Sequence, residues 1–235
     1  MPESAAAIVK ELKPLGSKGY CDVMKRHGIR EPIFGVKISE LKKIQKRVKK
    51  NHELALALYD TGIYDAMYLA GLIADETRMT KKDLQHWMDQ AYCTALGCNT
   101  VAWVTAESRY GFELALKWIE SKKPTVAAAG WSVLSCLVAL KQDDDLEIGT
   151  YRKLVKRAQD TLQDQHDDVK YSMNNFVISV GGYVKSLTSE AVTAAKAIGV
   201  VHVDMGDTEC KVPDAAGYIK KMTARGIKKR KTVRC

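Results

Sequence analysis

The pattern of hydrophobic and polar positions predicts an unequal pair of helices in the middle of the chain. Apolar residues recur at spacings of three and four through residues 112–121, which is typical of an amphipathic helix. Pro124 then interrupts the pattern, because proline cannot continue a helix and disfavours helical geometry in the residue before it. Residues 125–140 are apolar on nearly every face. One helix is therefore half exposed and the other covered, so the pair needs similar neighbours to bury its surface.

A matching pair lies earlier in the chain. The sequence ELALALYDT begins at Glu53 and ELALKWIES begins at Glu113, and each is followed by a break and an alanine-rich apolar run. A further pair is predicted between them, at residues 81–91 and 95–106, so the repeating unit is about 30 residues long. A repeated helical pair is the signature of an α-solenoid. The alternative is an ordinary bundle that happens to contain two similar leucine- and alanine-rich helices.

The rest of the chain predicts more helices and no sheet. No strand-like alternation extends beyond about five residues. Further helices are predicted at residues 5–15, 20–27, 37–50, 52–59, 64–74, 148–162, 169–184, 189–198 and 215–225, with an irregular segment at 199–214. We therefore predict an all-α protein with a single repeat domain over residues 1–222 and a basic C-terminal tail over residues 223–235.

Composition indicates the size of the core, the cellular location and the state of the cysteines. A chain of 235 residues with 46% hydrophobic residues can bury a continuous core. The N-terminus lacks the apolar core of a signal peptide and no stretch is long enough to span a membrane, so we expect a cytoplasmic protein. The six cysteines show no framework spacing and are expected to be reduced thiols. Cys93 and Cys98 have no histidine pair nearby, so neither a metal site nor a cofactor is expected.

The positive charge is clustered. The net charge is +9, and the excess falls on a predicted helix and on the tail. Dense basic faces attract phosphate backbones, and no hydrophobic anchor accompanies these residues as membrane binding would require. The alternative is a solvated helix face and a frayed tail. The candidate DNA-binding residues are Lys37, Lys42, Lys43, Lys46, Arg47, Lys49, Lys50, Lys228, Lys229, Arg230 and Lys231.

Four segments resemble a known family. They are FGVKISELKKIQKRVKKNHELALALYDTGIYDAMYLAGLIAD from Phe34, AAAGWSVLSC from Ala127, VKYSMNNFVISVGGY from Val169 and GDTECKVPDAAGYI from Gly206. Together they resemble the AlkD-like DNA alkylation repair proteins, over roughly residues 20–222. The resemblance implies an α-solenoid of HEAT-like antiparallel helix pairs whose positively charged concave face holds duplex DNA. Characterised members cut the N-glycosidic bond of cationic alkylpurines without flipping the lesion into a pocket.

The resemblance also implies a catalytic set, and this chain departs from it. The family places two tryptophans and an aspartate at the deoxyribose and an arginine at a phosphate. A cationic base needs no general acid, but the developing sugar cation needs a carboxylate. The corresponding positions here are Thr94, Cys98, Ala128 and Asn175, and residues 92–100 contain no Asp or Glu.

A substitute pair with the same spacing lies further along the chain. Trp103 and Glu107 are four residues apart, as the tryptophan and aspartate of the family are. Their simpler interpretation is a core tryptophan and a solvated glutamate at a helix end. We therefore assign no catalytic residue.

Three functions remain open from the sequence. The favoured one is a DNA-binding repeat protein of the alkylation repair family that lacks the usual glycosylase chemistry and recognises duplex DNA that is damaged, bent or branched. The second is an active glycosylase that releases cationic alkylated purines with non-standard residues. The third is a protein-interaction scaffold with an unknown partner. Convergence of the basic side chains on one face would favour DNA, and scatter would favour the scaffold.

Overall fold

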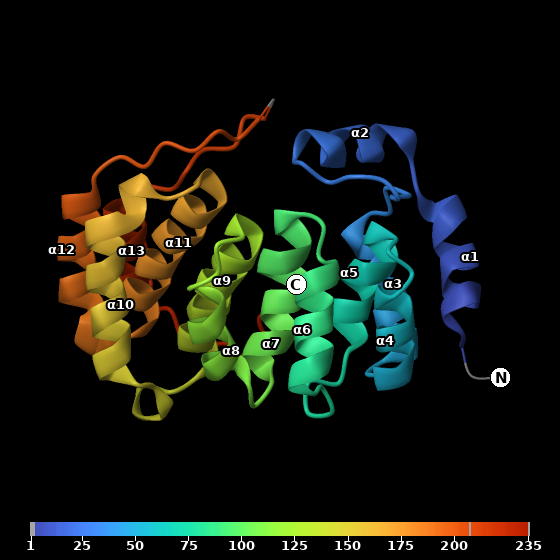
Figure 1. Cartoon of the computed structure of the whole chain (residues 1–235), viewed down its shortest axis with the longest axis horizontal. Helices are drawn as coiled ribbons and strands as arrows, with labels where there is room; N and C mark the ends of the chain where they lie inside the picture. Colours follow the sequence, from blue (N-terminus) through green and yellow to red (C-terminus); the bar gives the residue numbers. More distant parts are fainter. Residues whose placement is uncertain (1–2, 207, 235) are drawn as a thin grey trace.

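The protein is built from helices throughout. The computed structural model describes residues 3–206 and 208–234, and these contain no strand, only one isolated bridge between Gly16 and Val36. The α-helices are α1 Ala5–Leu15, α2 Lys18–Arg26, α3 Ile38–Val48, α4 His52–Tyr59, α5 Tyr64–Ile73, α6 Lys81–Gln90, α7 Ala102–Glu107, α8 Gly111–Trp118, α9 Pro124–Leu140, α10 Ile148–Thr161, α11 Asp167–Tyr183, α12 Thr188–Ile198 and α13 Ala215–Ala224 (Figure 1). Short turns η1 Leu96–Val101, η2 Asp143–Asp145, η3 Leu162–Asp164 and η4 Lys185–Leu187 lie between them.

The helices form five consecutive pairs in the described part of the chain. The pairs are α4/α5, α6 with η1 and α7, α8/α9, α10/α11 and α12/α13. Helices α5, η1–α7, α9 and α11 pack side by side as an inner layer, and α4, α6, α8, α10 and α12 cover it from outside. Figure 1 shows the pairs following one another in sequence order across the molecule. The prediction of an all-α solenoid is confirmed, because each pair packs chiefly on its neighbours.

The central pair forms for the reasons that its sequence suggested. Pro124 starts α9, where its missing N–H is not needed. At Gly130 a Cβ atom would lie 2.7 Å from the backbone nitrogen of Ile119, so glycine allows α8 and α9 to approach closely. The small and aromatic residues at the middle of this helix are all buried, namely Ala127, Ala129, Gly130 and Trp131.

The predicted helix at 95–106 is divided in the structure. Its first part, η1, is a π-helix, and α7 follows it directly. A π turn contains one residue more than an α turn, so it shifts the face on which side chains before and after it emerge. Gly71 faces this turn closely, since a Cβ there would lie 2.5 Å from Thr100 Cγ2. Hydrophobic periodicity alone does not distinguish the two kinds of turn.

Ion pairs join successive helices of the outer layer. Lys81 of α6 lies 2.6 Å from Glu113 of α8, and Arg152 of α10 lies 2.9 Å from Glu190 of α12. Arg157 pairs with Glu120 between them. Exposed pairs of this kind add little stability each. In each pair, the positive charge of one repeat is neutralised by a carboxylate of a neighbouring repeat.

The basic tail docks on the inner helices. We call residues 228–234 the C-terminal strap. The backbone N–H of Arg230 donates to Ala139 O at 2.7 Å, and Arg234 Nη1 donates to Ala74 O at 2.6 Å. These carbonyls end α9 and α5, where the last turns lack intrahelical partners and favour cations. Helix α13 ends at Ala224. The division into a repeat domain over residues 1–222 and a tail over residues 223–235 stays a prediction.

Candidate functional site

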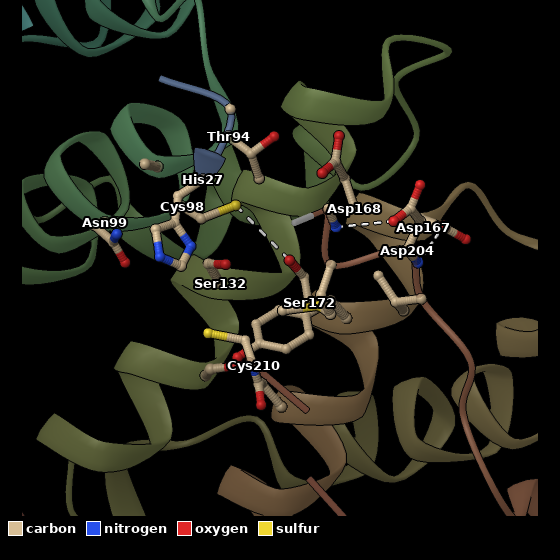
Figure 2. Close-up of a pocket in the computed structure, with 18 of the residues that line it drawn as sticks. His27, Thr94, Cys98, Asn99, Ser132, Asp167, Asp168, Ser172, Asp204 and Cys210 are labelled. Atoms are coloured by element: carbon tan, nitrogen blue, oxygen red, sulfur yellow. Dashed lines mark hydrogen bonds between the residues drawn. The ribbon is translucent and has the colours of Figure 1, made fainter. Parts of the chain in front are cut away.

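One large cavity opens on the inner helices. Its volume is about 740 Å³. Its walls come from η1 and α7, the middle of α9 and the first half of α11. Residues 26–28 at the end of α2 and the segment after α12, here called the post-α12 segment (residues 199–206 and 208–214), complete the rim. Figure 1 shows this segment running along the top of the array toward α2, and Figure 2 shows the cavity from close by.

Three of the four family-aligned positions meet in this cavity. Thr94 and Cys98, from the helical stretch that contains η1, and Asn175 of α11 all line it. Ala128 is fully buried in α9 and does not line it. Trp103, which is 7% exposed, also contributes to the wall.

The environment of Cys98 keeps its thiol neutral. Its Sγ atom lies 3.7 Å from Ser172 Oγ (Figure 2). Burial raises the pKa of Cys98 to about 11; hydrogen bonds from Ser132 and Ser172 oppose the rise, and the negative charge of Asp168 adds to it. At neutral pH this position therefore carries no fixed negative charge.

Carboxylates reach the cavity from a place that the alignment did not indicate. Asp167 and Asp168 begin α11, and Asp204 comes from the post-α12 segment. Asp167 Oδ2 accepts the backbone N–H of Asp204 at 2.9 Å, and this bond holds the pKa of Asp167 below its ordinary value. The Asp168 side chain is 32% exposed and lies 3.7 Å from His166 Nδ1. The helical spacing of 168, 172 and 175 would have placed Asp168 on the same face as Asn175.

The cations nearest the cavity were also missed from the sequence. Arg26 and His27, at the end of α2, line its rim. Burial raises the pKa of Cys93, next to Thr94, and the charge of Arg30 opposes that rise, so Arg30 lies near the η1 wall. These residues sit outside the dense basic runs, so charge clustering gave no signal for them.

The predicted basic helix divides into paired and unpaired cations. Lys43 lies 2.8 Å from Glu40, Arg47 lies 2.6 Å from Glu11 and 2.7 Å from Glu3, and Lys50 lies 2.5 Å from Glu76. Within the described residues no ion pair involves the other four, which are exposed: Lys37, Lys42, Lys46 and Lys49. None of the seven lines the cavity.

The predicted basic tail lies at the opposite ends of the inner helices from the cavity walls of η1 and α11. Lys229 Nζ donates to Val138 O at 2.9 Å and lies 2.8 Å from Asp143. Arg230 Nε donates to the hydroxyl of Tyr183 at 3.0 Å. Lys228 and Lys231 are exposed, and neither forms an ion pair in the part of the chain that the structure describes.

Glu107 is not a solvated helix end, and that interpretation was wrong. Its side chain is 12% exposed, and its Oε2 atom lies 2.8 Å from Arg234 Nε. Its other oxygen accepts the backbone N–H of Val233 at 3.0 Å. The chain end returns to cover this carboxylate, which does not line the cavity beside Trp103.

The two basic clusters meet at Glu76. Glu76 lies 2.5 Å from Lys50 of the basic helix and 2.7 Å from Arg234 of the strap. Arg234 is 6% exposed. Lys50 and Arg234 therefore both pair with the same carboxylate of this chain, and the buried Arg234 is not free to bind a ligand.

Comparison with known proteins gives the family of this chain. The family model described as DNA alkylation repair enzyme matches residues 8–219, so the chain belongs to that family. Uncharacterised proteins of Listeria innocua (Lin0241) and Listeria monocytogenes (Lmo0209) are 34% identical to it over 92% of this chain and 95% of theirs. A solved structure matches with a TM-score of 0.91 and 34% identity over 99% of this chain and 100% of the other. That protein is described as one of a family related to the HEAT-like repeat DNA glycosylases with affinity for branched DNA structures.

Two other features are absent from the described residues. No group of three or more His, Cys, Asp or Glu side chains is arranged to hold a metal ion there. No described helix is long and apolar enough to cross a membrane.

Proposed function

We propose that this protein binds branched DNA on the face that carries the cavity and does not cut the glycosidic bond. The observation that carries the proposal is the neutral Cys98 thiol at the position that the family resemblance assigns to the catalytic aspartate. The similarity to a protein with affinity for branched DNA extends over the whole chain and supports the choice of ligand.

The DNA backbone would cross the rim of the cavity. Asp167, Asp168 and Asp204 disfavour a phosphate inside it. Arg26 lies at the rim and Arg30 lies close to Cys93 beside it, and a guanidinium forms bidentate bonds with phosphate oxygens. The unpaired lysines of α3 add attraction that does not depend on sequence.

A matched pair of double variants tests this placement. Arg26→Ala with Arg30→Ala should weaken binding of a three-way DNA junction and lower the salt dependence, because about 0.9 is lost from the slope of log K against log salt for each phosphate contact. Lys122→Ala with Lys123→Ala removes the same charge from the exposed loop before α9 and should change binding much less. Equal losses from the two double variants would argue against contact at the cavity rim.

One observation favours a second candidate function. The Asp168 carboxylate lines the same cavity as Cys98, and a carboxylate there could stabilise a sugar cation. In that case the protein would release cationic alkylated purines with Asp168 in place of the usual aspartate. Release of 7-methylguanine by the wild type, and its loss in Asp168→Asn, would establish this alternative.

A further inference from the structure

The cavity presents hydrogen-bonding groups that the protein itself does not use. The side chains of Thr94, Asn99 and Asn175 make no hydrogen bond within the described residues, although Thr94 and Asn175 are partly buried. An amide offers both donors and an acceptor, and a hydroxyl offers one of each. Such groups recognise a ligand with a mixed polar edge. They are less suited to a simple anion.

The acidic groups make the cavity favour a ligand that donates hydrogen bonds. Asp168 and Thr94 both line the cavity (Figure 2), and the only ion-pair partner of Asp168 in the described residues is His166. An ionised carboxylate accepts hydrogen bonds and donates none. A ligand group beside it must therefore donate, as an amino group does.

Aromatic side chains complete the wall. Trp103 and Tyr171 both line the cavity, and Tyr171 is partly exposed. Aromatic faces stack on nucleobases whatever the base. The cavity volume of about 740 Å³ lies within the range of small-molecule sites, about 300–1,000 Å³.

We propose that the cavity holds one unpaired nucleobase from the branch point, and that Asp168 makes it prefer a base with an exocyclic amino group, such as cytosine, over thymine. The proposal rests on the proposed function, since a branch point is where a strand can supply an unstacked base. Cytosine presents an amino donor where thymine presents a carbonyl, and carboxylates accept from that donor. Arg26, at the rim, would hold the adjoining phosphate outside the cavity.

The test compares two three-way junctions that differ only in one unpaired nucleotide at the branch, cytosine or thymine. The wild type should bind the cytosine junction about tenfold more tightly. Asp168→Asn should abolish or reverse that preference, because an amide can donate to the thymine carbonyl. Asp164→Asn, an exposed carboxylate four residues away that does not line the cavity, should leave the preference unchanged. Tyr171→Ala should weaken both junctions equally, because stacking does not distinguish the bases.

The outcomes separate this proposal from the one on which it rests. Tight binding of both junctions with no difference between cytosine and thymine would overturn the base site and leave branched-DNA binding intact. No binding of either junction would overturn the proposed function as well. Free cytidine and thymidine, added as competitors of junction binding, identify the source of the base. Competition by cytidine alone supports a site that also takes detached nucleosides, and a preserved junction preference without competition supports delivery by the strand.

Discussion

Cys98 Sγ lies 3.7 Å from Ser172 Oγ, at the position where the family resemblance implies an aspartate. A carboxylate about 4 Å from a sugar cation contributes on the order of 4 kcal/mol near a surface, or nearly three decades in rate. The neutral thiol contributes little of this. We therefore expect methylated duplex DNA, incubated with excess protein, to release 7-methylguanine and 3-methyladenine only at the spontaneous rate, as measured by chromatography. Release well above a protein-free control would contradict the assignment.

The reactivity of Cys98 should follow its raised pKa. Burial disfavours the thiolate and raises the pKa to about 11, so the neutral form predominates below that pH. Because the thiolate is the nucleophile, alkylation of Cys98 by iodoacetamide should rise about tenfold per pH unit up to pH ~10 without a plateau. Ser172→Ala should slow it further, since the Ser172 hydroxyl stabilises the thiolate. Peptide-level mass spectrometry measures the rate, and a plateau near the ordinary value of 9.0 would refute the raised pKa.

Removing Arg234 should destabilise the whole array. The side chain is 6% exposed and pairs with Glu76 and Glu107. Arg234→Ala leaves both carboxylates without this partner, and breaking a buried pair costs about 3–5 kcal/mol in unfolding free energy. Lys231→Ala removes an exposed charge of the same strap and should cost less than about 0.5 kcal/mol. Urea unfolding compares the two, and equal stabilities would show that the ion pairs of Arg234 add nothing.

The carboxylate of Asp167 should hold the post-α12 segment in place. Its carboxylate accepts the N–H of Asp204, and that bond lowers the pKa of Asp167 below 3.8. A lowered pKa means that the bond stabilises the fold above the ordinary value and is lost as pH falls through the lowered one. Asp167→Ala should therefore speed hydrogen exchange of the Asp204 amide at neutral pH. Asp164→Ala provides the matched control, and unchanged exchange in Asp167→Ala would show that other contacts hold the segment.

The helical array could be predicted because its signals are local. Apolar spacing, Pro124 and the repeated ELAL sequence each act within one or two turns, and together they specify the helix pairs. Local motifs also indicated part of the cavity. Thr94, Cys98 and Asn175 were aligned with the family from motifs near each of them, and all three line the cavity.

The rest of the site depends on contacts between distant segments. The rim joins residues 26–28 to the post-α12 segment, and neither stretch has a periodic pattern. Glu107 meets Arg234 only because the strap returns along the inner helices. Such contacts join residues far apart in the sequence, so no short stretch of sequence indicates them. Several cations of the dense basic runs pair with carboxylates of this chain, which the sequence pattern did not indicate. The assignment of these runs to DNA binding stays a prediction.

The most direct test of the central claim is the affinity of the wild type for a three-way junction, compared with a linear duplex of the same sequence and charge, over a range of salt concentrations. The account predicts tighter binding of the junction at every salt concentration. It also predicts that log K falls linearly with log salt for both DNAs, because the protein contacts phosphates in both. Only the junction has a branch point, which accounts for its tighter binding. Equal affinity for junction and duplex, or no salt-dependent binding of either, would contradict it.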